Sequence, residues 1–148
     1  MKLPIRAAVF LSLLAPAVWA AAPLPAVHVY KSPACGCCGK WVDHMKASGF
    51  DVITHNTNNV AEHKARLGVP VAMGSCHTAE VGGYLVEGHV PASDVKRLLA
   101  EKPRAAGVIG LAVPGMPASS PGMDSPLKTP YEVMLVRSCG TTAVYARH

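Results

Sequence analysis

The segment Cys35-Gly36-Cys37-Cys38 constrains this chain more than any other feature, because it places three cysteines within four residues. A strand-like run, Val27 to Tyr30, precedes it, and a helix-like run, Lys40 to Ala47, follows it. A strand-to-helix junction lies at the positive end of a helix dipole, which favours thiolates over thiols. Adjacent cysteines can hardly form a disulfide with each other without strain, so we expect several thiols to converge on one site. The pattern therefore indicates metal binding or redox chemistry.

Residues 1–20 have the three parts of a secretory signal peptide. Lys2 and Arg6 are followed by the apolar run Ala7 to Leu14 and by small residues that end at Ala20. We predict cleavage after Ala20, a periplasmic mature protein, and a flexible lead-in at 21–26. The apolar run is shorter than the roughly 20 residues of a membrane-spanning helix, and no later run approaches that length, so we expect no membrane span.

The five cysteines all follow the predicted cleavage point. An odd number of cysteines in an oxidising compartment cannot form a closed disulfide framework, so at least one thiol is free, metal-bound or transiently paired. The formal net charge is +5. Its basic side chains are spread over helix-like segments, which is typical of solvated faces and argues against nucleic-acid binding. No long apolar helix face requires a partner, so we expect a monomer.

The order of strand-like and helix-like runs predicts an α/β fold, with a thioredoxin-like β-α-β-α-β-β-α domain over residues 27–106. The expected strands are 27–30, 50–54, 78–81 and 84–87, and the expected helices are 40–48, a segment from Asn58 or Asn59 to Leu67, and 91–101. Residues 107–148 are expected to form a C-terminal extension packed on the metal site. It consists of a Pro/Gly-rich loop at 107–125 and a β-hairpin of residues 131–136 and 142–145 around a Cys139-Gly140 turn.

The predicted topology brings a fourth thiol to the cysteine motif. The residues that enter the third strand, Ser75-Cys76-His77-Thr78, should lie beside the first helix, where thioredoxins have a cis-proline. Neither Pro70 nor Pro91 fits that position. The absence of a proline at this position argues against a function in protein-disulfide exchange and favours a metal site. The fourth strand returns antiparallel to the third, so His89, which follows it, should lie at the same rim of the sheet as Cys76.

The predicted loop contains the tripeptide Pro-Gly-Met twice, at 114–116 and 121–123. If the loop folds over the rim, Met116 and Met123 add thioethers, which are soft ligands that favour Cu(I) over zinc. Hydrophobic anchoring of the loop is an equal alternative for these two methionines. Cysteine, methionine and histidine together point to copper.

These residues resemble the CopG-type periplasmic copper-resistance proteins, formerly catalogued as a domain of unknown function. The resemblance covers residues 27–146 and is carried by four blocks in order. The blocks are Tyr30-Lys31-Ser32-Pro33-Ala34-Cys35-Gly36-Cys37-Cys38, Ser75-Cys76-His77-Thr78-Ala79, Val86-Glu87-Gly88-His89-Val90-Pro91, and Gly110-Leu111-Ala112-Val113-Pro114-Gly115-Met116-Pro117 through Gly122-Met123.

The resemblance implies a thioredoxin-like domain whose extension helps to hold copper, a cysteine-bridged site for several copper ions, and interconversion of Cu(I) and Cu(II) for detoxification and export. The ligands that it implies are Cys35, Cys37, Cys38, Cys76, His89, Met116 and Met123. A periplasmic copper efflux system and an electron-transfer protein are the candidate partners. Cys139 departs from the pattern and is expected to be an extra exposed thiol.

Two other functions stay open. The chain could be a thiol-disulfide oxidoreductase that uses Cys35 and Cys38, which have the C-x-x-C spacing, or a passive copper chaperone. A structural zinc site is less favoured, since zinc has no use for methionine. The sequence leaves open whether His77 is a ligand of the metal site. The remaining expectations are packing roles for Met45 and Met73, surface positions for His28, His44, His55 and His63, and a disordered His148.

Overall fold

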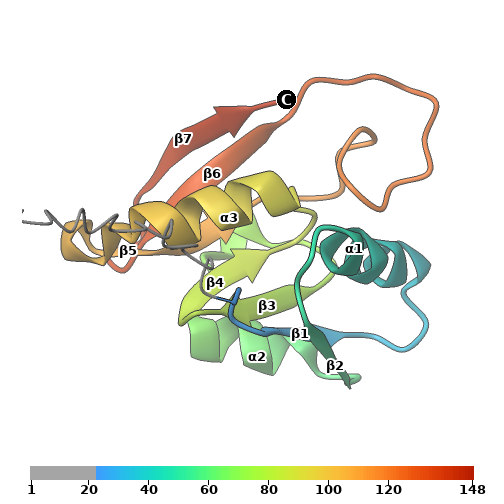
Figure 1. The fold of residues 1–148 in the computed structure, drawn as a ribbon, viewed down its shortest axis with the longest axis horizontal. Helices are drawn as coiled ribbons and strands as arrows, with labels where there is room; N and C mark the ends of the chain where they lie inside the picture. The colour runs from blue at the N-terminus through green and yellow to red at the C-terminus, as the bar shows by residue number, and fades with distance from the viewer. Residues whose placement is uncertain (1–22) are drawn as a thin grey trace, which may run out of the picture.

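The computed structural model describes residues 23–148, so the predicted signal peptide lies outside the described residues. Figure 1 shows a single twisted sheet with helices on both of its faces. The strands are β1 (Val27–Lys31), β2 (Val52–Asn56), β3 (Thr78–Val81), β4 (Tyr84–Glu87), β5 (Val108–Ala112), β6 (Glu132–Arg137) and β7 (Thr142–Arg147). The helices are α1 (Gly36–Ala47), α2 (Val60–Leu67) and α3 (Ala92–Glu101), with 3-10 turns η1 (Val71–Met73) and η2 (Pro103–Ala106).

The strand order across the sheet is β2-β1-β3-β4-β5-β6-β7. β1 and β2 are parallel, β3 runs antiparallel to β1, and β4 runs antiparallel to β3. This is the predicted β-α-β-α-β-β-α order, and it brings the end of β1, the start of β3 and the end of β4 to one rim of the sheet. The N-terminus of α1 follows β1 at that rim, as the site prediction requires.

Two of the helices cover one face of the sheet and enclose the main core. The alternation of β1 turns Val27 and Val29 inward, where they pack with Trp41 and Met45 of α1 and Leu98 of α3. The shorter α2 lies on the opposite face (Figure 1). Met45 is fully buried and Met73 packs against a small cluster under β4 and β5, so the packing roles predicted for both methionines are confirmed.

The first part of the predicted loop is a strand, which corrects the sequence-based prediction. β5 pairs parallel with β4 and antiparallel with β6, so the sheet continues through residues 107–148. Gly110 is the reason that the run resembled a loop. A Cβ at this position would lie 1.9 Å from the carbonyl oxygen of Leu85, so only glycine lets the two strands pair here.

The remaining predicted elements are close to those observed. α1 begins at Gly36 rather than at Lys40, so the cysteines form its first turn. Asn59 caps α2 through its side chain, and Gly68 ends that helix in the left-handed conformation, with φ of 77°. The final hairpin turns at Gly140, which has φ of 81°.

The histidines outside the rim differ most from expectation. His148 is ordered, because its Nε2 lies 2.7 Å from Asp94 Oδ2 and its ring stacks on Tyr131. The four predicted surface histidines are half-buried, and three of them, His28, His55 and His63, form a stack with Tyr30 between β1, β2 and α2.

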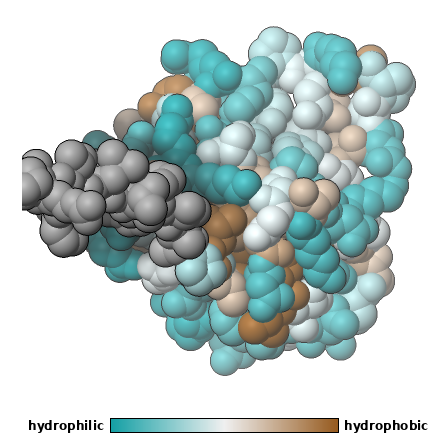
Figure 2. All heavy atoms as spheres, viewed as in Figure 1, coloured by the Kyte–Doolittle hydropathy of each residue, from teal (hydrophilic) through white to brown (hydrophobic). Residues whose placement is uncertain are grey.

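No described helix is long and apolar enough to cross a bilayer. In Figure 2 hydrophilic residues cover most of the visible face, and apolar residues show mainly in a small area near its middle.

Candidate metal centre

The first turn of α1 presents three sulfur atoms. Cys35 is the N-cap, and its Sγ accepts a hydrogen bond from the backbone N–H of Cys38 at 3.4 Å. Cys35 and Cys38 are joined in a disulfide, while Cys37 is a free thiol whose Sγ lies 3.5 Å from Cys35 Sγ. The helix N-terminus and the capping N–H favour negative charge on sulfur once the disulfide is reduced.

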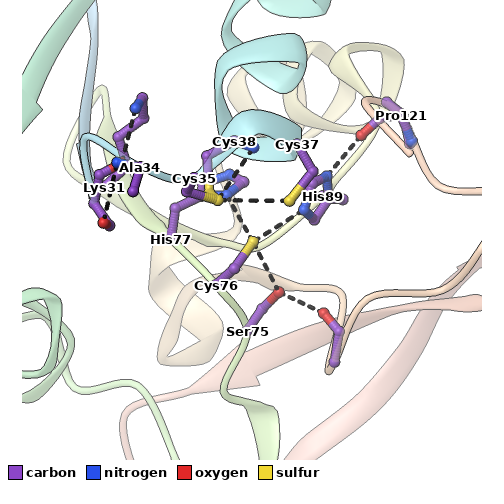
Figure 3. The surroundings of a disulfide bond; sticks show 12 residues. Lys31, Ala34, Cys35, Cys37, Cys38, Ser75, Cys76, His77, His89 and Pro121 are labelled. Atoms are coloured by element: carbon purple, nitrogen blue, oxygen red, sulfur yellow. Dashed lines mark hydrogen bonds between the residues drawn. A yellow bond between two sulfur atoms is a disulfide. The ribbon is translucent and has the colours of Figure 1, made fainter. Parts of the chain in front are cut away.

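Cys76 comes from the segment before β3 and faces this turn (Figure 3). The sulfur atoms of Cys35, Cys37, Cys38 and Cys76 all lie within 4.8 Å of one another. Burial, followed by the nearby Cys37, raises the pKa of the Cys76 thiol to about 11. A metal ion that binds this sulfur replaces its proton, and the charge of the ion then offsets the cost of burying the thiolate.

Two imidazoles complete the other side of the site. His89 Nε2 lies 3.0 Å from Cys76 Sγ, and His77 Nδ1 lies 3.4 Å from the same sulfur. Both histidines are fully buried. Burial lowers the pKa of His77 well below its ordinary value of 6.5, and the charges of His89 and Lys64 lower it further. Burial also lowers the pKa of His89. Low pKa values keep imidazoles in the neutral form that binds metals.

Cys76 therefore belongs to two groups of side chains that are placed to hold a metal ion. One contains the four cysteines, and the other contains Cys76, His77 and His89, whose ligand atoms also lie within 4.8 Å of one another. Figure 3 shows the sulfur of Cys76 facing both the cysteines of α1 and the ring of His89. Sequence reasoning left His77 undecided, and the structure places it within reach of the site.

A buried carboxylate supports the Cys76 segment, and sequence reasoning missed it. Glu87 is fully buried at the end of β4, where it pairs with Lys64 of α2 and accepts the backbone N–H of Ser75 at 2.6 Å. Lys64 Nζ also donates to the carbonyl oxygen of His77 at 3.2 Å. The only signal for this pair in the sequence is a glutamate at the end of an apolar strand.

The two Pro-Gly-Met units contact different parts of the site. In the first unit, Gly115 donates its N–H to the carbonyl oxygen of Gly74 at 3.0 Å and accepts the hydroxyl of Ser75. The Met116 side chain is 55% exposed. In the second unit, the carbonyl oxygen of Pro121 lies 2.7 Å from His89 Nδ1, and Met123 is half-buried.

The donor set fits copper. Thiolates and imidazoles are ligands that copper prefers, and thiolates in particular stabilise Cu(I). The Nε2 atom of His77 is buried and has no hydrogen-bond partner within residues 23–148, as expected for an imidazole whose environment a ligand would complete. A group of four cysteines also suits zinc, whereas the added imidazoles and thioethers favour copper. Cys139 is exposed in the β6–β7 turn, as predicted.

Comparison with known proteins identifies the family. Two solved structures, described as copper resistance protein copG in Form 2 and Form 1, are 42% and 41% identical to this chain, with TM-scores of 0.78 and 0.76. The alignments cover 86% and 84% of this chain and 99% and 98% of those chains. The chain belongs to the CopG family.

A family model described as protein of unknown function DUF411 matches residues 73–123 of this CopG-family chain. The matched range contains Cys76, His77 and His89 and both Pro-Gly-Met units, whereas the cysteine motif of α1 precedes it. No curated protein is significantly similar to the chain. The CopG structures share the mixed α/β architecture with its sheet of seven strands.

Proposed function

We propose that this chain is a periplasmic copper-resistance protein that holds several copper ions in a cysteine-bridged cluster and interconverts Cu(I) and Cu(II). The observation that carries the proposal is the shared position of Cys76, whose sulfur joins the group of four cysteines to the pair of buried imidazoles. The proposed ligands are Cys35, Cys37, Cys38, Cys76 and His89, with thioethers from Met116 and Met123. The names of the two similar structures support copper as the cargo.

The arrangement suits an ion that changes valence. Sulfur ligands favour Cu(I), and nitrogen ligands are better suited to Cu(II). Because both kinds of donor meet at one sulfur, copper can be held in either oxidation state without leaving the protein. The rim of the sheet and the first turn of α1 fix the positions of the donors, which limits the rearrangement between the two states. Copper would then pass to an efflux system, and electrons to a separate carrier.

Anaerobic titration of the reduced protein with Cu(I), in competition with a chromophoric chelator, tests the binding part of the proposal. We expect more than one copper ion per chain and a large loss of affinity in Cys37→Ser. Cys139→Ser is the matched control, because both residues are free cysteines and Cys139 lies outside the cluster. Equal affinities for the two variants would contradict the proposal.

A redox titration of the copper-loaded protein tests the interconversion. We expect reversible cycling between Cu(I) and Cu(II), with the copper retained by the protein throughout. Release of copper on oxidation would instead identify a passive chaperone, which holds one valence only.

The Cys35–Cys38 disulfide favours a second candidate function, thiol-disulfide exchange. In this reaction a thiolate of the reduced pair attacks a substrate disulfide, which forms a mixed disulfide and releases the first substrate thiol. The second cysteine of the pair then attacks the mixed disulfide, releases the second substrate thiol and restores the Cys35–Cys38 disulfide. Reduction of a model disulfide by the metal-free, reduced protein tests it. A rate that disappears in Cys35→Ser would support exchange, and an inert wild-type protein would exclude it.

A further inference from the structure

The second Pro-Gly-Met unit contacts His89 and lies against the backbone of α1. We propose that Pro121 and Gly122 are positioning residues for His89: they fix the ring tautomer that presents Nε2 to a metal ion beside Cys76. The proposal rests on the proposed copper-binding function and adds residues to which no role has been assigned. The segment 117–124, called the strap below, is part of the loop between β5 and β6, which Figure 1 shows extending across to α1.

The two nitrogen atoms of His89 have different partners. Nδ1 lies 2.7 Å from the carbonyl oxygen of Pro121, and a carbonyl oxygen can only accept a hydrogen bond. Nδ1 must therefore carry the proton of the neutral ring. Nε2 is left with its lone pair, and it lies 3.0 Å from Cys76 Sγ. In the metal-free protein, Nε2 can accept the S–H of Cys76, and a bound ion would replace this proton and join the same two atoms.

Gly122 allows the strap to approach α1 closely enough for this contact. Gly122 has φ of 87°, and a Cβ at this position would lie 2.7 Å from the backbone nitrogen of Trp41 and 2.8 Å from the carbonyl oxygen of Cys37. Both atoms belong to the backbone of α1, so they cannot move aside for a side chain. Any other residue would push the strap away from the helix and carry the Pro121 carbonyl away from His89.

The strap has its own internal support. Ser120 is 2% exposed, and its hydroxyl donates to the carbonyl oxygen of Pro117 at 2.7 Å. The N–H of Met123 donates to the carbonyl oxygen of Ser120 at 3.1 Å, and Asp124 pairs with Lys40 of α1. These contacts hold Pro121 in a folded turn, so its carbonyl is aimed before any ion arrives.

His77 provides an internal contrast. Its Nδ1 lies 3.4 Å from Cys76 Sγ, and its Nε2 is buried without a hydrogen-bond partner. Among the described residues, no carbonyl oxygen meets hydrogen-bond geometry with its ring, whereas that of Pro121 does so with His89. Outer partners of metal-binding histidines typically contribute about 10-fold to 100-fold to metal affinity. We therefore expect the strap to change copper affinity mainly through His89.

The experiment compares Gly122→Ala with Gly140→Ala in the full mature chain. Both glycines have positive φ, 87° and 81°, so the backbone cost of alanine is similar, but a Cβ at position 140 meets nothing within 4 Å. Two-dimensional ¹H–¹⁵N NMR of the metal-free protein reports the histidine tautomers, with His89→Gln to assign the His89 signal. Competition against a Cu(I) chelator then gives affinity.

We expect His89 to carry its proton on Nδ1 in the wild type and in Gly140→Ala. In Gly122→Ala we expect a mixture of tautomers and about 10-fold weaker binding of Cu(I). An unchanged His89 signal together with an unchanged affinity in Gly122→Ala would overturn the proposal. If Gly122→Ala does not fold, the wild-type spectrum still decides, because a proton on Nε2 of His89 would contradict the proposed role of Pro121.

The tautomer measurement uses no metal. A wild-type protein that fails to bind copper would refute the proposed function without altering the NMR result, so the two failures are distinguishable.

Discussion

The two sides of the metal centre are built in different ways. The thiol side comes from one turn of α1, where Cys35, Cys37 and Cys38 lie within four residues. The imidazole side comes from segments before β3 and after β4, where His77 and His89 are fully buried and held by contacts from α2 and the strap. The thiol side depends on local sequence, whereas the imidazole side depends on tertiary structure. The sulfur of Cys76 is the atom that the two sides share.

The largest expected effect follows from removal of that shared sulfur. Cys76→Ser should lower the affinity for Cu(I) by about 100-fold or more, because it takes one ligand from both groups and outer partners alone account for 10-fold to 100-fold. A chelator competition assay measures the loss, and Cys139→Ser should bind copper as the wild type does. If Cys76→Ser retained full affinity, the two sides would not be joined at this residue.

Loss of the buried ion pair that supports the imidazole side should lower the free energy of unfolding. Lys64→Met leaves the fully buried Glu87 without its cation, which typically costs about 3 kcal/mol when a buried pair loses one member. Urea unfolding of the metal-free protein measures this free energy. The double variant Lys64→Met/Glu87→Gln should recover part of the loss, and a double variant less stable than Lys64→Met would contradict the assignment.

Acid should destabilise the metal-free protein through its buried imidazoles, while the thiol side keeps its disulfide. Burial lowers the pKa values of His44, His77 and His89 below 6.5. Such bases stabilise the folded chain fully above the unfolded pKa and lose that contribution as the pH falls through the folded pKa. The Tm should therefore fall between about pH 7 and about pH 5.

His44→Gln provides the control for this pH dependence. His44 Nε2 accepts the N–H of Ala92 at 3.0 Å, and the amide oxygen of glutamine can accept in its place without titrating. The variant should show a smaller fall in Tm than the wild type. A wild-type Tm that is constant over this pH range would show that burial of the imidazoles is not linked to protonation.

The smallest expected effect separates the two Pro-Gly-Met units. Met123→Leu should lower Cu(I) affinity by a few-fold, because the half-buried Met123 lies in the strap, two residues after the Pro121 carbonyl that contacts His89. Met116→Leu should change it less, since this side chain is 55% exposed. Chelator competition measures both, and the opposite order would assign the ligand role to the first unit.

The same contrast explains what could be predicted from the sequence. The thiol side was evident from one short motif, and the antiparallel return of β4 was enough to bring His89 to the rim. Glu87 and Lys64 were missed because their pairing joins β4 to α2 and has no local pattern. β5 was missed because Gly110, which permits close strand pairing, is also a loop signal. The role of Gly122 depends on its approach to α1, which local sequence does not encode.

Metal analysis of the protein purified from copper-grown cells is the most direct test of a shared copper site. Inductively coupled plasma mass spectrometry, with a protein assay, gives the identity of the metal and its ratio to the chain. We expect more than one copper per chain in the wild type and in Cys139→Ser, and little copper in Cys76→Ser. Zinc in place of copper, or equal copper in Cys76→Ser and the wild type, would contradict the site described above.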